Sequence, residues 1–134
     1  YQLAVVIDDE LQSVNNVVRG TDLLTSTIKQ NYINKILDFS EKKYMHIPIA
    51  LINNQKLSKG NGDKLKSNNL SLILIEGLKF LKQKIPNNIA DGSPEEIIKY
   101  ASNNWDIRPL KYEKNIELSP TQKLIVDNIH KEMH

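Results

Sequence analysis

Apolar and polar positions in the first half of the chain change from strand-like to helix-like spacing and back. Residues 2–7 form an apolar, β-branched run that ends at two aspartates, which is typical of a strand entering a turn. Residues 14–19 form a weaker run closed by Gly20, and the two runs predict a hairpin with a loop at residues 10–13. The apolar run 44–52 predicts another strand, in which Pro48 indicates an edge position or a bend.

Helical spacing appears first at residues 26–38, where Thr25 or Ser26 could cap an amphipathic helix. The apolar positions of this helix are Ile28, Tyr32, Ile33, Ile36 and Leu37.

The second half of the chain is predicted to be helical. An apolar segment at residues 70–84 predicts a buried helix that Pro86 ends. The stretch "SPEE" predicts a helix with a capping box, which begins at Ser93 and runs to about Asn104. "SPTQ" repeats the device at residues 119–122 and predicts a helix that bears Leu124, Ile125, Ile129 and Met133. Strands followed by helices indicate an α/β segment that leads into a helical subdomain.

Composition narrows the classes of protein. A chain of 134 residues with 40% hydrophobic content is one domain or a piece of one. The net charge of +2 is compatible with an RNA or nucleotide partner. The absence of cysteine excludes disulfides and thiolate metal sites, and the three histidines are too scattered to suggest a metal site. With no cysteine in the chain, a cytoplasmic location is the simplest expectation. No apolar run reaches the roughly 18 residues of a membrane span.

Arg19 is the first candidate for binding chemistry, because the chain has two arginines against sixteen lysines. Arginine binds carboxylates and phosphates through two parallel hydrogen bonds, and Gly20 lets the backbone turn tightly beside it. The alternative is a local ion pair with Asp22 at the end of a strand. Tyr1 could donate its phenol to a ligand from a strand start, or it could be a half-buried strand tyrosine.

The loop "KLSKG" is the second candidate. Lys56 and Lys59 could both face a polyphosphate and offset the charge that grows in a transition state. Ser58 could hold the turn or bond a phosphate oxygen, and Gly60 would let the loop close. The alternative is a solvated connector between a strand and a helix.

Three other features favour structural roles. His46 lies inside an apolar run and is expected to be structural. Trp105 follows a predicted helix and is expected to pack against it. Asp8 and Asp9 would face opposite ways on a strand, so they do not predict a pair of catalytic acids, and a role in the turn is expected.

Four blocks in order resemble the C-terminal part of the catalytic domain of glutamyl-type class I aminoacyl-tRNA synthetases. They are "YQLAVVIDD", "VVRGTDLLTST" with Gln30 shortly after, "YMHIPIAL" and "KLSK". "KLSK" resembles the second ATP signature loop of that family, usually written KMSKS, with Gly60 in place of the last serine. "LSLILIEGLKFLKQ" followed by "ASNNWDI" is similar to the short paralogues of the glutamyl enzyme, which lack the long anticodon-binding region.

The resemblance implies an α/β fold and a division of the chain. Residues 1–66 would be the C-terminal half of a Rossmann-like nucleotide-binding domain, and residues 67–110 a helical, stem-like subdomain. Residues 111–134 match no block of the family and would form a helical tail. The first ATP signature of the family and the cysteine-rich zinc site of the short paralogues lie upstream of these blocks. We therefore expect a C-terminal fragment that holds no metal and is inactive alone.

The resemblance also implies roles for single residues. Tyr1 and Arg19 fall at positions that contact glutamate, and Asp22 falls near the ribose of ATP. Val5 is apolar where the discriminating glutamyl enzymes often carry a polar residue. The positions implied near the adenine and phosphates of ATP are Leu51, Ile52, Lys56, Ser58 and Lys59.

The activity implied is ATP-dependent activation of glutamate, with Mg²⁺ as the counter-ion of ATP, and glutamyl transfer to the queuosine base of tRNA(Asp). The expected protein is a monomer. Ordinary charging of a tRNA acceptor end is the alternative within the family. A non-catalytic RNA-binding module is a third reading, which the scarcity of aromatic residues and the spread of basic residues disfavour.

Overall fold

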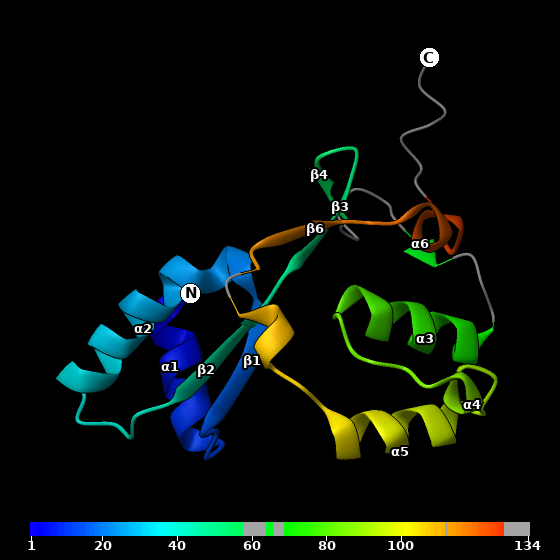
Figure 1. The fold of residues 1–134 in the computed structure, drawn as a ribbon. Helices are drawn as coiled ribbons and strands as arrows, with labels where there is room; N and C mark the ends of the chain where they lie inside the picture. The colour runs from blue at the N-terminus through cyan, green and yellow to red at the C-terminus, as the bar shows by residue number, and fades with distance from the viewer. Residues whose placement is uncertain (58–63, 66–68, 112, 128–134) are drawn as a thin grey trace. The chain divides into compact units, whose positions relative to one another are not determined.

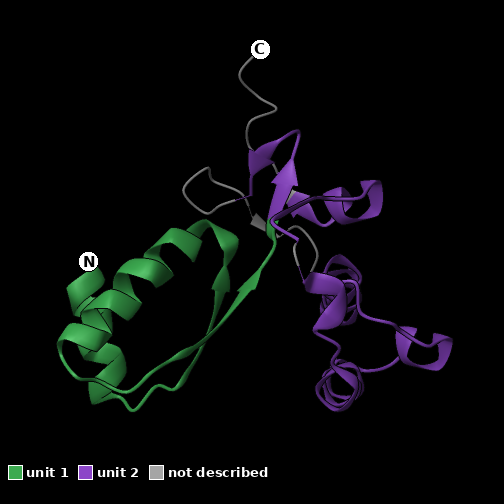
Figure 2. Ribbon diagram, turned by 60° about the vertical axis from the view of Figure 1, so that its left-hand side comes forward, with its two compact units in different colours: residues 1–49 green, residues 50–134 purple. Residues whose placement is uncertain are grey.

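The computed structural model describes residues 1–57, 64–65, 69–111 and 113–127. The chain divides into two compact units, Tyr1–Ile49 and Ala50–His134 (Figure 2). These units do not follow the functional division into residues 1–66, 67–110 and 111–134, which stays a prediction. Within the described part of the chain, no helix is both long enough and apolar enough to cross a membrane.

The first unit combines two helices with a pair of parallel strands. Its helices are α1 (Gln2–Leu11) and α2 (Leu24–Ile36), and its strands are β1 (Asn16–Gly20) and β2 (Lys43–Ile47). A short 3₁₀ helix, η1 (Thr21–Leu23), joins β1 to α2. The strands are parallel because the α2 crossover returns the chain to the same end of the sheet. In their register, Arg19 lies opposite His46. The two helices lie side by side next to these strands (Figure 1).

The strand predicted at residues 2–7 is wrong, because these residues lie in helix α1. A continuous apolar run satisfies helical and strand spacing equally, so its pattern could not decide between them. The observed burial has helical spacing: Gln2, Val5, Val6, Asp9 and Glu10 are the positions shielded from solvent. The predicted hairpin is therefore also wrong, and Asp8 and Asp9 lie on a helix instead of at a turn.

Helix α2 is where the sequence predicts a helix, but its apolar stripe is exposed. Ile28, Tyr32 and Ile36 are 72%, 66% and 62% exposed. The buried stripe is polar and consists of Ser26, Gln30 and Asn34. The helix begins at Leu24 without a side-chain cap, so the predicted cap at Thr25 or Ser26 is wrong. Ser26 instead accepts a hydrogen bond from the side chain of Gln2 on α1.

The break predicted at Pro48 is confirmed. It separates β2 from β3 (Ile49–Ile52), since proline has no backbone N–H to donate to a sheet. A partly buried ion pair joins helix α1 to the segment before β2: Nζ of Lys42 lies 2.5 Å from the carboxylate of Glu10.

The second unit contains two small sheets and several short helices. Strand β3 lies between β4 (Gln55–Lys56) and β6 (Asn115–Glu117), and β5 (Lys64–Leu65) pairs with β7 (Val126–Asp127). The helical elements are α3 (Leu70–Phe80), α4 (Asn87–Ala90), α5 (Pro94–Asn104), η3 (Arg108–Leu110) and α6 (Pro120–Leu124). One apolar cluster joins Ile52 to Leu118, Ile125 and Val126, and another joins α3 to α5 through Ile75, Leu78 and Ile97.

Both predicted capping boxes are confirmed. The Ser93 hydroxyl accepts from the backbone N–H of Glu96, whose carboxylate accepts from the N–H of Ser93. Ser119 and Gln122 make the same reciprocal pair at the start of α6. Helix α3 ends at Phe80, so the helix predicted to continue to residue 84 and to end at Pro86 is too long. The chain turns sooner because Lys82 takes a left-handed conformation with φ 53°.

The tail predicted as helical is only partly so. Helix α6 spans five residues, and β6 and β7 flank it, because both strands find partners far away in sequence. Ile129 and Met133 lie outside the described residues. Trp105 follows α5 and lines an apolar groove with Ala101 and Ser102 of that helix.

Neighbouring isoleucines on α5 give a matched test of this packing. Ile97 is fully buried, whereas Ile98 is 53% exposed. We expect Ile97→Ala to lower the free energy of unfolding by about 2–5 kcal/mol, because it leaves a cavity between α3 and α5. Ile98→Ala makes the same change in helix propensity and should cost less than about 1 kcal/mol. Urea unfolding followed by circular dichroism measures both, and equal losses would contradict the assigned core.

Candidate functional site

The guanidinium of Arg19 is held by two side chains of the helix that follows it. Its Nη1 donates to Oε1 of Gln30 at 2.8 Å, and its Nη2 donates to Oγ1 of Thr27 at 2.7 Å. Thr27 and Gln30 are three residues apart on α2, so both face β1. These two partners are neutral, so the bonds orient the guanidinium without neutralising its charge.

A second layer of hydrogen bonds fixes Gln30. Its amide donates to Oε1 of Gln2 at 2.9 Å, and the amide of Gln2 donates to the Ser26 hydroxyl at 3.1 Å. Gln30 is 1% exposed, so its amide cannot turn freely towards solvent. Tyr1 is the N-cap residue of α1 and directly precedes Gln2. It is 75% exposed and begins a helix, so the expectation of a strand tyrosine is wrong.

Strand β2 contributes an aromatic side to this site. The Arg19 guanidinium lies 4.9 Å from the ring centroid of Tyr44, a distance at which a cation is attracted to the ring face. The Tyr44 and His46 rings stack with centroids 6.3 Å apart, and Nε2 of His46 lies 2.9 Å from Oγ1 of Thr27. Burial, followed by the nearby Arg19 charge, lowers the pKa of His46, which favours the neutral imidazole. His46 therefore supports Thr27 without adding a second positive charge at neutral pH.

Two side chains fill the space where a Cβ would stand at Gly20, so a larger residue here would have to displace them. A Cβ at this position would lie 2.5 Å from Oδ1 of Asp22 and 2.8 Å from Cδ1 of Ile49. Asp22 itself lies in η1, and its side chain folds back towards β1. The terminal nitrogens of Arg19 bond to Gln30 and Thr27, while its buried Nε lacks a hydrogen-bond partner. This guanidinium has the charge and the fixed orientation that carboxylate binding needs.

The second candidate region is the hairpin of β3 and β4. Leu51 pairs with Lys56 across the hairpin, and Ile52 pairs with Gln55. The connecting turn is Asn53–Asn54, where both residues are left-handed with φ 52° and 62°. Ile52 is buried in the apolar cluster and Lys56 is exposed at the end of β4. Ser58 and Lys59 lie outside the described residues.

Sequence reasoning missed the partners of Arg19. Thr27 ends the block "VVRGTDLLTST" and Gln30 follows shortly after, but the resemblance assigned no role to either residue. Their spacing on a helix that follows Arg19 was the available signal. The roles of Tyr44 and His46 depend on the register of β1 against β2, which no local pattern gives.

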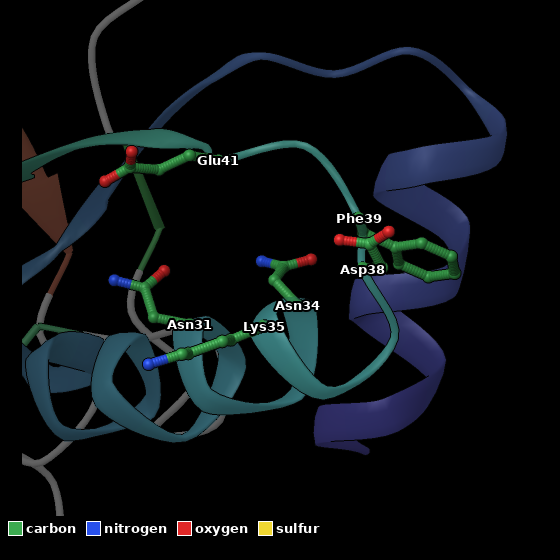
Figure 3. Close-up of a pocket in the computed structure, with 6 residues that line it drawn as sticks. All are labelled: Asn31, Asn34, Lys35, Asp38, Phe39 and Glu41. Carbon is green, nitrogen blue, oxygen red and sulfur yellow. The ribbon is translucent and has the colours of Figure 1, made fainter.

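A polar cavity of about 360 Å³ also opens in the first unit, between α2 and the loop that follows it (Figure 3). Its lining residues are Asn31, Asn34, Lys35, Asp38, Phe39 and Glu41. Oδ1 of Asn34 is buried there without a hydrogen-bond partner. None of these residues carries a role predicted from the sequence. Among the described residues, no three histidines, aspartates or glutamates gather as a metal site would require.

Comparison with known proteins gives the same assignment from three directions. A family profile described as "tRNA synthetases class I (E and Q), catalytic domain" matches residues 1–104. The chain is 35% identical over 119 residues to a glutamyl-Q tRNA(Asp) synthetase of Pseudomonas syringae pv. syringae, covering 87% of this chain and 40% of the relative. It is 34% identical over 130 residues to the enzyme of that name from Photorhabdus laumondii, covering 96% of this chain and 41% of the relative.

A solved structure shares the fold. It is a glutamate tRNA ligase from Elizabethkingia meningosepticum in complex with its amino acid, with a TM-score of 0.60 and 18% identity. The likeness covers 93% of this chain and 29% of that one, and it confirms the predicted α/β fold. The chain spans about 40% of the length of the curated relatives that it matches. With 104 of its 134 residues matched by the family profile, the chain belongs to the class I tRNA synthetases of the glutamate and glutamine type.

Proposed function

We propose that the full-length protein activates glutamate with ATP and transfers the glutamyl group to the queuosine base of tRNA(Asp). The observation that carries the proposal is the Arg19 guanidinium, oriented by Thr27 and Gln30 and left with its charge uncompensated by these bonds. Relatives named glutamyl-Q tRNA(Asp) synthetase, at 34–38% identity, support this substrate choice. The protein would act as a cytoplasmic monomer.

In the first step, Arg19 would bind a carboxylate of glutamate, with the exposed Tyr1 phenol as a second contact. The α-carboxylate oxygen attacks the α-phosphorus of ATP. A bond forms between that oxygen and phosphorus, and the bond to the bridging oxygen of the β-phosphate breaks. Pyrophosphate leaves with the electron pair, and Mg²⁺ accompanies ATP as its counter-ion.

The hairpin of the second unit would hold the nucleotide. Backbone groups of Leu51 and Ile52 would meet the adenine, and Asp22 would lie near the ribose. Lys56 and Lys59 would neutralise charge that develops on the pyrophosphate oxygens, and Ser58 would bond a phosphate oxygen. Such cations act mainly in the transition state, because the charge on these oxygens grows as the bond breaks.

In the second step, the queuosine base attacks the carbonyl carbon of the adenylate and AMP leaves. The experiment compares glutamate transfer to tRNA(Asp) with and without queuosine, and to tRNA(Glu), using radiolabelled glutamate and the full-length protein. The proposal expects transfer only to queuosine-containing tRNA(Asp). Charging of tRNA(Glu) instead would support the ordinary acceptor-end reaction, and no transfer to any tRNA would contradict an enzyme of this family.

Arg19→Lys should impair the use of glutamate more than the use of ATP. Lysine keeps the charge but cannot bond Thr27, Gln30 and a carboxylate with one planar group. We expect kcat/KM for glutamate in ATP–pyrophosphate exchange to fall by a factor that corresponds to about 2–3 kcal/mol of transition-state stabilisation. The KM for ATP should change by less than about twofold. Arg108→Lys is the matched control, because Arg108 is exposed and paired with Asp106. Equal effects of the two variants would refute Arg19 as the carboxylate anchor.

Lys56→Ala and Lys59→Ala should slow adenylate formation while ATP binding persists. We expect each to lower the single-turnover rate by about 10²–10³, the usual effect of removing one preorganised charge from a transition state. Lys99→Ala, an exposed lysine of α5, controls for loss of charge. Rapid-quench kinetics measures the single-turnover rate of adenylate formation, and a separate binding assay measures the affinity for ATP. A normal rate in both variants would show that the segment is only a connector.

A further inference from the structure

Glu117 contacts the turn of the β3–β4 hairpin from the opposite end of the second unit's sequence. Its Oε1 accepts from the backbone N–H of Asn53 at 2.7 Å, and its Oε2 accepts from the N–H of Asn54 at 3.3 Å. Glu117 ends strand β6 and lies beyond residues 1–104, which the family profile matches. One carboxylate therefore binds two successive amides that are more than sixty residues away in sequence.

The backbone geometry of the turn allows it to bind such a partner. Asn53 and Asn54 are both left-handed, a conformation that disfavours any residue with a Cβ, although asparagine tolerates it better than most. In this conformation the two N–H groups point to the same side and form a small anion-binding concavity. Lys123, followed by these two backbone N–H groups, lowers the pKa of Glu117, so the carboxylate is charged at neutral pH.

The turn sets which residues of the hairpin face each other. With a two-residue turn, Leu51 lies opposite Lys56 and Ile52 lies opposite Gln55. If β4 shifted by one residue against β3, Lys56 would move to the other face of the hairpin. The carboxylate of Glu117 stabilises one register over the alternatives.

Further contacts make the segment around Glu117 a brace, which we define as residues 115–127. The backbone N–H of Leu118 donates to the carbonyl of Leu51 at 2.9 Å. Leu118, Ile125 and Val126 bury the apolar side of Ile52, with Leu57 packed against them. Strand β7 pairs with β5 through Val126 and Leu65. The brace pairs directly with β5 through β7, and it reaches β4 indirectly, because β6 pairs with β3 and β3 pairs with β4. In sequence, β4 precedes residues 58–63 and β5 follows them.

We propose that Glu117 is a positioning residue, which holds the β3–β4 hairpin in the register that presents Lys56 to the phosphates of ATP. The placing of Lys56 at the phosphates rests on the proposed function, whereas the hold on the hairpin does not. Lys123 lies 2.9 Å from Oε1 of Glu117 and orients the carboxylate. Without a role in positioning, Glu117 would be a surface ion pair whose loss changes little.

Glu117→Gln tests the proposal, because glutamine keeps the size of the side chain but offers one acceptor oxygen in place of two. Glu113→Gln is the matched control, because it removes a carboxylate from the same region of the chain, and that carboxylate pairs with Lys82 and not with the hairpin turn. We expect hydrogen exchange at the Asn53 and Asn54 amides to quicken about tenfold in Glu117→Gln and not in Glu113→Gln. The kcat of ATP–pyrophosphate exchange by the full-length protein should fall about tenfold, with the KM for glutamate unchanged.

A second variant separates positioning from other roles. Asn54→Gly favours the left-handed turn without any carboxylate, so adding it to Glu117→Gln should restore kcat to within about twofold of the starting protein. Failure of this rescue, or hydrogen exchange and kcat equal to those of Glu113→Gln, would overturn the proposal. If the unaltered protein shows no ATP–pyrophosphate exchange, the proposed function fails, and the hydrogen-exchange comparison still decides whether Glu117 holds the hairpin.

Discussion

The first unit depends on one constraint, the need to hold the charged guanidinium of Arg19 in a half-buried place. Thr27 and Gln30 meet that need from helix α2, which explains why this helix buries its polar stripe and leaves Ile28 and Tyr32 exposed. Gln2 supports Gln30 and so ties α1 to the same group. The polar contacts between both helices follow from this guanidinium, since burying a charge without such partners would be strongly unfavourable.

The second unit faces a different constraint, which is to keep a short hairpin in one register. Two strands joined by a two-residue turn are marginal alone, and here the turn itself has an unfavourable backbone. The brace answers both problems, since β6 adds a third strand and Glu117 binds the turn amides. The first unit thus holds a fixed cation, and the second unit holds an ordered hairpin.

Local signals in the sequence predicted what local interactions determine. The capping boxes at Ser93 and Ser119 were predictable because their hydrogen bonds close within three residues. The helical state of residues 2–11 was not, because a continuous apolar run suits either period, and the contacts of Gln2 reach 24 and 28 residues along the chain. Arg19 stood out by its rarity, but its partners did not. Glu117 gave no signal, since its contact with Asn53 spans 64 residues.

The most direct measurement is a crystal structure of the full-length protein with glutamate and a non-hydrolysable ATP analogue. We expect a glutamate carboxylate within hydrogen-bonding distance of the Arg19 guanidinium, which still donates to Thr27 and Gln30. We also expect the adenine against the backbone of Leu51 and Ile52. A glutamate bound elsewhere, with Arg19 in contact only with its present partners, would contradict the account.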